Sequence, residues 1–231
     1  MTATTLDLEQ TTLRAVNSAL HVANDGSFRI VNPRGAHALA AGVNSEIDVE
    51  IEGSVGYYCA GMNQRGTIRV RGNASTGLAE NMMSGLVHIT GSATMSAGAS
   101  GNGGLLVIEG NAGARCGISM KGIDIVVGGN VGHMSSFMGQ AGNLVVLGDA
   151  AADLGDSCYE PHIFVRGDVE SLGADCTEKE LRPEHLETLT RLLERSGLTA
   201  NPTDFRRYGS ARTLYNFHPD DIDAELAAQE G

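Results

Sequence analysis

Histidine is a common catalytic base and zinc ligand at neutral pH. The sequence contains seven, at His21, His37, His88, His133, His162, His185 and His218. On the 19-residue repeat described below, no two of them fall at the same repeat position. A zinc site needs several ligands that converge on one point. We therefore predict surface or hydrogen-bonded histidines and no metal site.

The four cysteines include no C-x-x-C pair, so they predict neither a metal knuckle nor a disulfide framework. Cys59 and Cys116 share a repeat position but lie three coils apart, about 14 Å by strand spacing, which is too far for a disulfide. Cys158 and Cys176 could lie near each other on adjacent coils. We interpret all four as free thiols, which favours a reducing compartment.

Clustered carboxylates can perform general acid–base chemistry, as in β-helical enzymes that cleave polysaccharides. The last coils of the repeat carry Asp153, Asp156, Asp168 and Asp175. No row of Arg or Lys accompanies them, and solvated turns explain them. An independent enzyme or ligand-binding solenoid is the alternative hypothesis, which a pocket formed by Asp153, Asp156 and His162 would favour.

The segment 126–132, VVGGNVG, looks like a phosphate-binding glycine loop that follows a strand. Similar glycine turns recur at 110–113 and 53–56, so the segment belongs to a repeat. A dinucleotide fingerprint also needs a helix directly after the loop, and the repeat leaves no room for one. We predict no cofactor-binding and no catalytic residue in this chain.

A repeat of 19 residues organises most of the chain. Glycines mark it at Gly53, Gly72, Gly91, Gly110, Gly129, Gly148 and Gly167. The residues two and four positions before each glycine are all Val, Ile or Leu, which predicts a strand with one buried face. Asn, Asp or Ser follows each glycine and favours a turn. A small residue stands seven positions after each glycine.

The repeat must wind as a solenoid, because no helix fits between its strands. We predict an all-β fold, a right-handed parallel β-helix of seven 19-residue coils, over residues 46–176. Residues 1–45 are expected to form an N-terminal arm and cap, and residues 177–231 a C-terminal helix and tail. A leucine stripe between Pro183 and Gly197 predicts one amphipathic helix, and the acidic end from Asp220 is expected to fray.

The side chain three positions before each repeat glycine should point away from the core. In the first three coils this residue is polar: Glu50, Arg69 and His88. In the last four it is apolar, and we call these residues the outer stripe: Val107, Val126, Val145 and Phe164. Such a stripe predicts a cover, either the leucine helix of the same chain or a partner subunit. We assign the outer stripe as the predicted subunit interface.

Composition excludes several classes of partner. The chain has 231 residues, with 16 Lys+Arg against 28 Asp+Glu and a formal net charge of −12, so nothing drives it towards nucleic acid or anionic lipid. No apolar run approaches the length of a membrane-spanning helix, and the N-terminus lacks the pattern of an export signal. We expect a cytoplasmic protein that binds proteins or small molecules, with no nucleic acid and no membrane.

The coils from about Glu46 to Cys176 resemble the C-terminal β-helix of the glutamate synthase large chain, the GXGXG domain. The segment 205–212, FRRYGSAR, is similar to the end of that chain. A subunit of formylmethanofuran dehydrogenase has the same kind of domain. A free-standing chain of this length with a short N-terminal arm resembles most the β-helix subunit of N-methylglutamate synthase, a methylamine–glutamate N-methyltransferase.

The resemblance implies a non-catalytic subunit of a complex that converts methylamine and L-glutamate into N-methyl-L-glutamate and ammonia. The implied partners are a class II glutamine amidotransferase-like subunit and a glutamate synthase-like subunit with FMN and, as in glutamate synthases, an iron–sulfur cluster. The catalytic residues of the family have no match, since no Cys follows Met1 and no cysteine cluster is present. The implied role is a scaffold. Alternatively, the chain is a subunit of a glutamate synthase-like or formylmethanofuran dehydrogenase-like complex.

Overall fold

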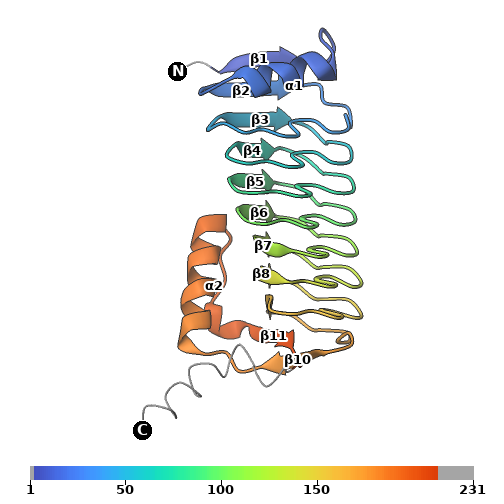
Figure 1. Ribbon diagram of the computed structural model, residues 1–231, viewed down its shortest axis with the longest axis vertical. Helices are drawn as coiled ribbons and strands as arrows, with labels where there is room; N and C mark the ends of the chain where they lie inside the picture. Colours follow the sequence, from blue (N-terminus) through green and yellow to red (C-terminus); the bar gives the residue numbers. More distant parts are fainter. Residues whose placement is uncertain (1–2, 213–231) are drawn as a thin grey trace.

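The computed structural model describes residues 3–212, whose strands form one tall stack (Figure 1). The strands are β1 (Thr4–Asp7), β2 (Ser27–Val31), β3 (Asp48–Glu52), β4 (Thr67–Val70), β5 (Leu86–Ile89), β6 (Leu105–Ile108), β7 (Lys121–Val127), β8 (Ala141–Val146), β9 (His162–Val165), β10 (Cys176–Lys179) and β11 (Arg206–Ser210). The helices are α1 (Leu13–Val22), α2 (Pro183–Ser196) and the short 3-10 helix η1 (Pro202–Asp204).

One 11-stranded sheet runs the length of the stack, in the order β1 to β9, then β11 and β10. From β1 to β9 each strand pairs in parallel with the next strand of the chain, which confirms the predicted parallel solenoid. From β3 to β9 the paired residues lie one repeat apart, as in Ile68 opposite Val87, except at the start of β7, where a register shift pairs Lys121 with Ala141. The inward-pointing residues of these strands are buried in one continuous core.

The residue two positions after each repeat glycine forms a second parallel contact line. These residues are bridged in order from Val55 through Ala74, Ala93, Ala112, Val131 and Ala150 to Val169. Each coil is therefore fixed to its neighbours on two sides of the core. Small or β-branched side chains suit this line because it faces the β-sheet across a narrow interior.

The repeat glycines are required by close approach. The residue after each of the first six glycines accepts, through its side-chain oxygen, the backbone N–H of the equivalent residue on the next coil, at 2.8–3.1 Å, so that the row runs from Ser54 to Asp168. A Cβ added at Gly91 would fall on the Asn73 Oδ1 that makes this bond, and one at Gly129 would fall on the Asn111 Oδ1. We call this row of bonds the Asx–Ser ladder.

The arc that returns each coil to its strand uses left-handed backbone at alternate residues. In the first repeat these are Tyr58, Ala60 and Met62, with φ of 58°, 56° and 55°. Their amides donate alternately to the following coil and the preceding coil, for example from Ala60 to the Leu39 carbonyl at 3.0 Å. Left-handed backbone costs a non-glycine residue about 1–2 kcal/mol, and these bonds between coils offset that cost.

The N-terminal segment extends the sheet as well as covering it. β2 pairs with β3, and β1 pairs with β2, both in parallel. Thr12 caps α1 by accepting the Ala15 amide at 3.2 Å, and Val16 and Leu20 bury the apolar side of α1 against the core. The first coil therefore begins before residue 46, because β2 already makes the same parallel contacts as the strands of the repeat.

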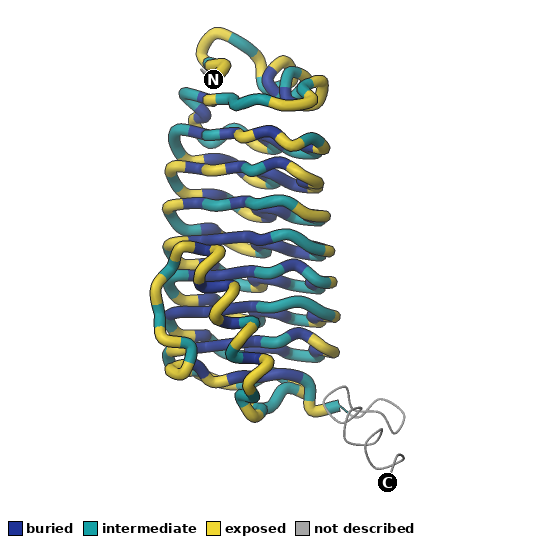
Figure 2. Tube along the Cα trace, turned by 90° about the vertical axis from the view of Figure 1, so that its left-hand side faces the viewer, coloured by how far each residue is buried: buried dark blue, intermediate teal, exposed yellow. Residues whose placement is uncertain are grey.

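The C-terminal segment folds back over the outer face of the sheet (Figures 1 and 2). α2 runs from Pro183 to Ser196, and Gly197, with a left-handed φ of 74°, caps its C-terminus. The chain then returns through η1, and β11 pairs antiparallel with both β9 and β10. The predicted acidic end from Asp220 lies outside the described residues.

Candidate functional site

The outer stripe lies under α2. Its four residues, Val107, Val126, Val145 and Phe164, are all 0% exposed. They form a second hydrophobic cluster, separate from the core of the solenoid, with Leu189, Leu192 and Leu193 of α2 and with Phe205. In Figure 2, α2 crosses in front of buried strand segments and turns an exposed side to solvent.

This burial corrects the prediction that the outer stripe is the subunit interface. Side chains without exposed surface cannot contact a partner, and α2 is one of the two covers considered from the sequence. Fully burying a Val, Leu or Phe side chain contributes about 1.5–3 kcal/mol of stability. Burial of the stripe therefore stabilises the docked position of α2. The outer stripe therefore offers no free surface to a partner subunit.

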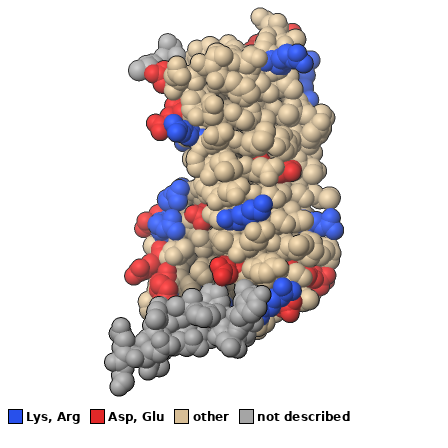
Figure 3. Space-filling model, viewed as in Figure 1, with Lys and Arg blue, Asp and Glu red and all other residues tan. Residues whose placement is uncertain are grey.

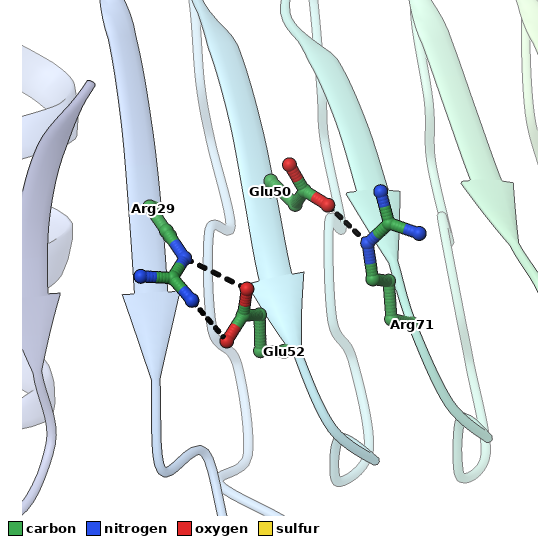
Figure 4. A network of polar contacts seen from close by, with 4 residues as sticks. All are labelled: Arg29, Glu50, Glu52 and Arg71. Atoms are coloured by element: carbon green, nitrogen blue, oxygen red, sulfur yellow. Dashed lines mark hydrogen bonds and ion pairs between the residues drawn. The ribbon is translucent and has the colours of Figure 1, made fainter. Parts of the chain in front are cut away.

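The polar half of the same face carries ion pairs that run between neighbouring strands. Arg29 donates to both carboxylate oxygens of Glu52, at 2.7 and 2.8 Å, and Arg71 pairs with Glu50 (Figure 4). His88 Nε2 lies 2.8 Å from Glu109 Oε1. These side chains are partly exposed, and exposed pairs contribute only about 0–1 kcal/mol each. They make this half soluble without a cover.

A polar cluster marks the border of α2. Asn143 donates to Asp124 at 2.7 Å, and the guanidinium groups of Arg191 and Arg195 lie 4.0 and 3.8 Å from the same carboxylate. Asn143 Oδ1 is buried and has no hydrogen-bond partner among the described residues. Both arginines belong to α2, so the cluster links α2 to the sheet beside the apolar contact. Figure 3 shows basic and acidic side chains close together in several places on the visible face.

Asp153, Asp156 and His162, which would form the pocket of an independent enzyme or ligand-binding solenoid, each contact a different residue. Asp153 lies 3.4 Å from His133, and Asp156 accepts the Ser157 hydroxyl at 2.7 Å. His162 packs edge to face against His185, with the ring centroids 5.0 Å apart. Across residues 3–212, no group of three or more His, Cys, Asp or Glu side chains is placed to hold a metal ion. These contacts give no support to a shared catalytic pocket.

All four cysteines are free, and they fall into two classes. Burial raises the pKa of Cys59 and of Cys116 to about 12, so these thiols stay protonated and unreactive. Interaction between the Cys158 and Cys176 thiols lowers the pKa of Cys158 and raises the pKa of Cys176. The adjacency considered from their 18-residue spacing is thus present in the structure.

Two pairs of exposed apolar side chains project from the turns and bends between the strands, which we call the turn edge of the solenoid. Met62 and Met83 form the first projection, and Met138 and Tyr159 form the second. The Met83 amide donates to Asn63, next to Met62, and the Tyr159 amide donates to Gly139, next to Met138, both at 2.8 Å. The projections therefore have the same construction, four coils apart, or about 19 Å by strand spacing.

Reasoning from sequence missed these projections, although a signal was present. Met62 and Met138 both stand nine positions after a repeat glycine, and Met83 and Tyr159 both stand eleven positions after one. These positions are polar in the coils between, with Ser100, Asn102 and Ser119 among them. A survey of every repeat position for large apolar residues, and not only of the strand positions, would have found them.

The described part of the chain contains no helix that is long and apolar enough to span a membrane. No known family profile matches the sequence. The chain is 61% identical to Protein GlxC of Rhizobium meliloti (strain 1021) over 224 residues, which cover 95% of this chain and 98% of that protein. At this identity, over nearly the whole of both chains, the chain belongs to the family of Protein GlxC.

Proposed function

We propose that this chain is a non-catalytic structural subunit of a glutamate synthase-like complex. Within that class, we propose N-methylglutamate synthase, which converts methylamine and L-glutamate into N-methyl-L-glutamate and ammonia. The chain would hold an amidotransferase-like subunit and an FMN-bearing synthase-like subunit at a fixed distance. The coils resemble the GXGXG domain of glutamate synthase, and this resemblance supports the choice of complex.

The observation that carries the scaffold role is the continuous bonding between coils. The Asx–Ser ladder runs without a break from Ser54 to Asp168, and a second line of backbone bridges runs parallel to it from Val55 to Val169. Such a stack resists bending. Transfer of an amine between two active sites depends on a fixed separation, because poor positioning slows the reaction.

The two projections are the surfaces that we propose for partner contact. Methionine adapts its shape to a partner, and tyrosine offers a large contact area at low entropy cost. Met62, Met83 and Met138 are each 45–50% exposed. Two equal projections at a fixed separation suit a subunit that must contact two partners.

The first experiment is purification of the tagged chain from its own host under mild conditions, followed by native mass spectrometry and an absorbance spectrum. We expect two larger subunits and a flavin band to copurify with it. The complex should form N-methylglutamate from methylamine and glutamate. A flavin complex that uses only ammonia would correct the choice to a glutamate synthase-like enzyme. A chain that purifies alone and colourless would overturn the scaffold role.

Paired variants test the contact surfaces. Met62→Ser with Met83→Ser, and Met138→Ser with Tyr159→Ser, should each release one partner subunit while the chain stays folded. Met95→Ser is the matched control, because Met95 is exposed to a similar extent but belongs to neither projection. If both double variants retain both partners, the projections are not the contact surfaces.

A further inference from the structure

Cys158 and Cys176 occupy equivalent places on adjacent coils. Leu154 and Leu172 form a parallel bridge, and each cysteine stands four residues after one of them. Adjacent strands lie about 4.8 Å apart, and disulfides form when the Cα atoms are about 4.4–6.8 Å apart. The register therefore brings the two backbones within the range that a disulfide needs.

The Cys176 side chain occupies a gap that a glycine of the preceding coil leaves open. Cys176 Sγ lies 2.7 Å from the place where a Cβ on Gly155 would stand, so any other residue there would displace the sulfur. The Cys158 amide donates to the Gly155 carbonyl at 3.1 Å, which holds Cys158 at the same spot. The Cys176 sulfur thus lies beside the turn of the preceding coil that carries Cys158.

The environment favours reaction at this pair. Hydrogen bonding with the Cys176 thiol is the largest influence on the pKa of Cys158 and lowers it despite burial, and the Arg212 guanidinium acts in the same direction. The same contact raises the pKa of Cys176, so the first proton leaves from Cys158. Arg212 is held in place by Asp175, at 2.5 and 2.8 Å, and lies over the Tyr159 ring.

We propose that Cys158 and Cys176 are a redox-active pair that closes reversibly to an intramolecular disulfide. With hydrogen peroxide as the oxidant, two S–H bonds break and one S–S bond forms. The two electrons released by the sulfurs reduce the peroxide, its O–O bond breaks, and both thiol protons leave in two molecules of water. The bond would tie β10 to the preceding coil at the C-terminal end of the stack.

The test counts free thiols and measures intact mass before and after mild peroxide treatment of the folded protein. We expect the thiols to fall from four to two, the mass to drop by two hydrogens, and dithiothreitol to reverse both changes. Peptide mapping of the oxidised protein should join the segments that carry Cys158 and Cys176. The closed form should melt at a higher temperature than the reduced form, since the link restricts the unfolded chain.

Two variants separate this pair from the other thiols. Cys176→Ser should abolish the loss of hydrogens, whereas Cys59→Ser should leave it intact, because Cys59 is buried and has no cysteine on a neighbouring coil. The proposal is overturned if the wild-type chain keeps four thiols, links other cysteines, or gains oxygen atoms on Cys158 or Cys176 where these residues should lose hydrogens. Mapping the wild-type chain needs no variant, so a variant that fails to fold does not obscure the result.

Discussion

The outer face of the sheet has two halves, and they differ in whether their outward side chains face solvent or are covered. On β3 to β5 the outward position carries Glu50, Arg69 and His88, which are partly exposed and pair with charged residues on or directly after a neighbouring strand. On β6 to β9 the same position carries the outer stripe, which α2 covers completely. The inner positions are aliphatic in both halves and pack into one core.

This difference separates two tasks that a repeat protein must perform. The inward positions, the Asx–Ser ladder and the second bridge line set the shape of each coil, and they continue unchanged through both halves. The outward position decides only what covers the coil. A solenoid can therefore change its surface from charged to apolar without any change in its backbone.

The largest expected effect comes from placing a charge under α2. Val145→Asp would bury an unpaired carboxylate and should lower the free energy of unfolding by about 3–5 kcal/mol. Arg69→Ser, at the same repeat position in the uncovered half, should cost less than about 1 kcal/mol. Urea unfolding measures both. Equal small losses would mean that α2 does not cover the stripe in solution.

Removing one side chain from the underside of α2 should have the next largest effect. Leu189→Ala would leave a cavity over the outer stripe and should cost about 2–5 kcal/mol. Glu187→Ala is the control, since Glu187 lies on the exposed side of the same helix. Limited proteolysis should cut α2 faster in Leu189→Ala only. Resistance to cleavage equal to that of the control would argue against tight docking.

A change in the Asx–Ser ladder should affect both halves equally. Asn73→Ala and Asn130→Ala each remove the acceptor for one backbone N–H, of Ser92 and Asp149 respectively, and should each cost about 0.5–1.5 kcal/mol. Amide hydrogen exchange should quicken at those two residues. A much larger loss at one site than at the other would show that the ladder also depends on the cover.

The smallest effect is expected from the ion pairs of the polar half. Glu52→Gln should weaken the pairing with Arg29 and change the stability by less than about 1 kcal/mol, and less still in high salt. Thermal unfolding at low and high salt measures this change. A loss of several kcal/mol would mean that these pairs are shielded from solvent, and the contrast between the two halves would fail.

The strands and their register could be predicted because one aliphatic pattern recurs in every coil. The cover of the outer stripe could also have been decided from length: α2 has 14 residues, or about 21 Å of helix, which matches the roughly 14 Å height of four stacked stripe residues with a margin at each end. The alternating left-handed arc could not be predicted, because Tyr58 and Met62 have no local preference for that backbone. Bonds from neighbouring coils impose it.

The two projections lie four coils apart, so a single coil does not reveal their repetition. Their proposed role, contact with partner subunits, involves proteins outside this chain. Hydroxyl-radical footprinting of the free chain and of the complex tests that use most directly, because methionine and tyrosine are the residues oxidised. We predict that Met62, Met83, Met138 and Tyr159 lose oxidation in the complex, while Met95 keeps it. Equal oxidation of all five residues in both samples would contradict the proposal that the turn edge holds the partner subunits.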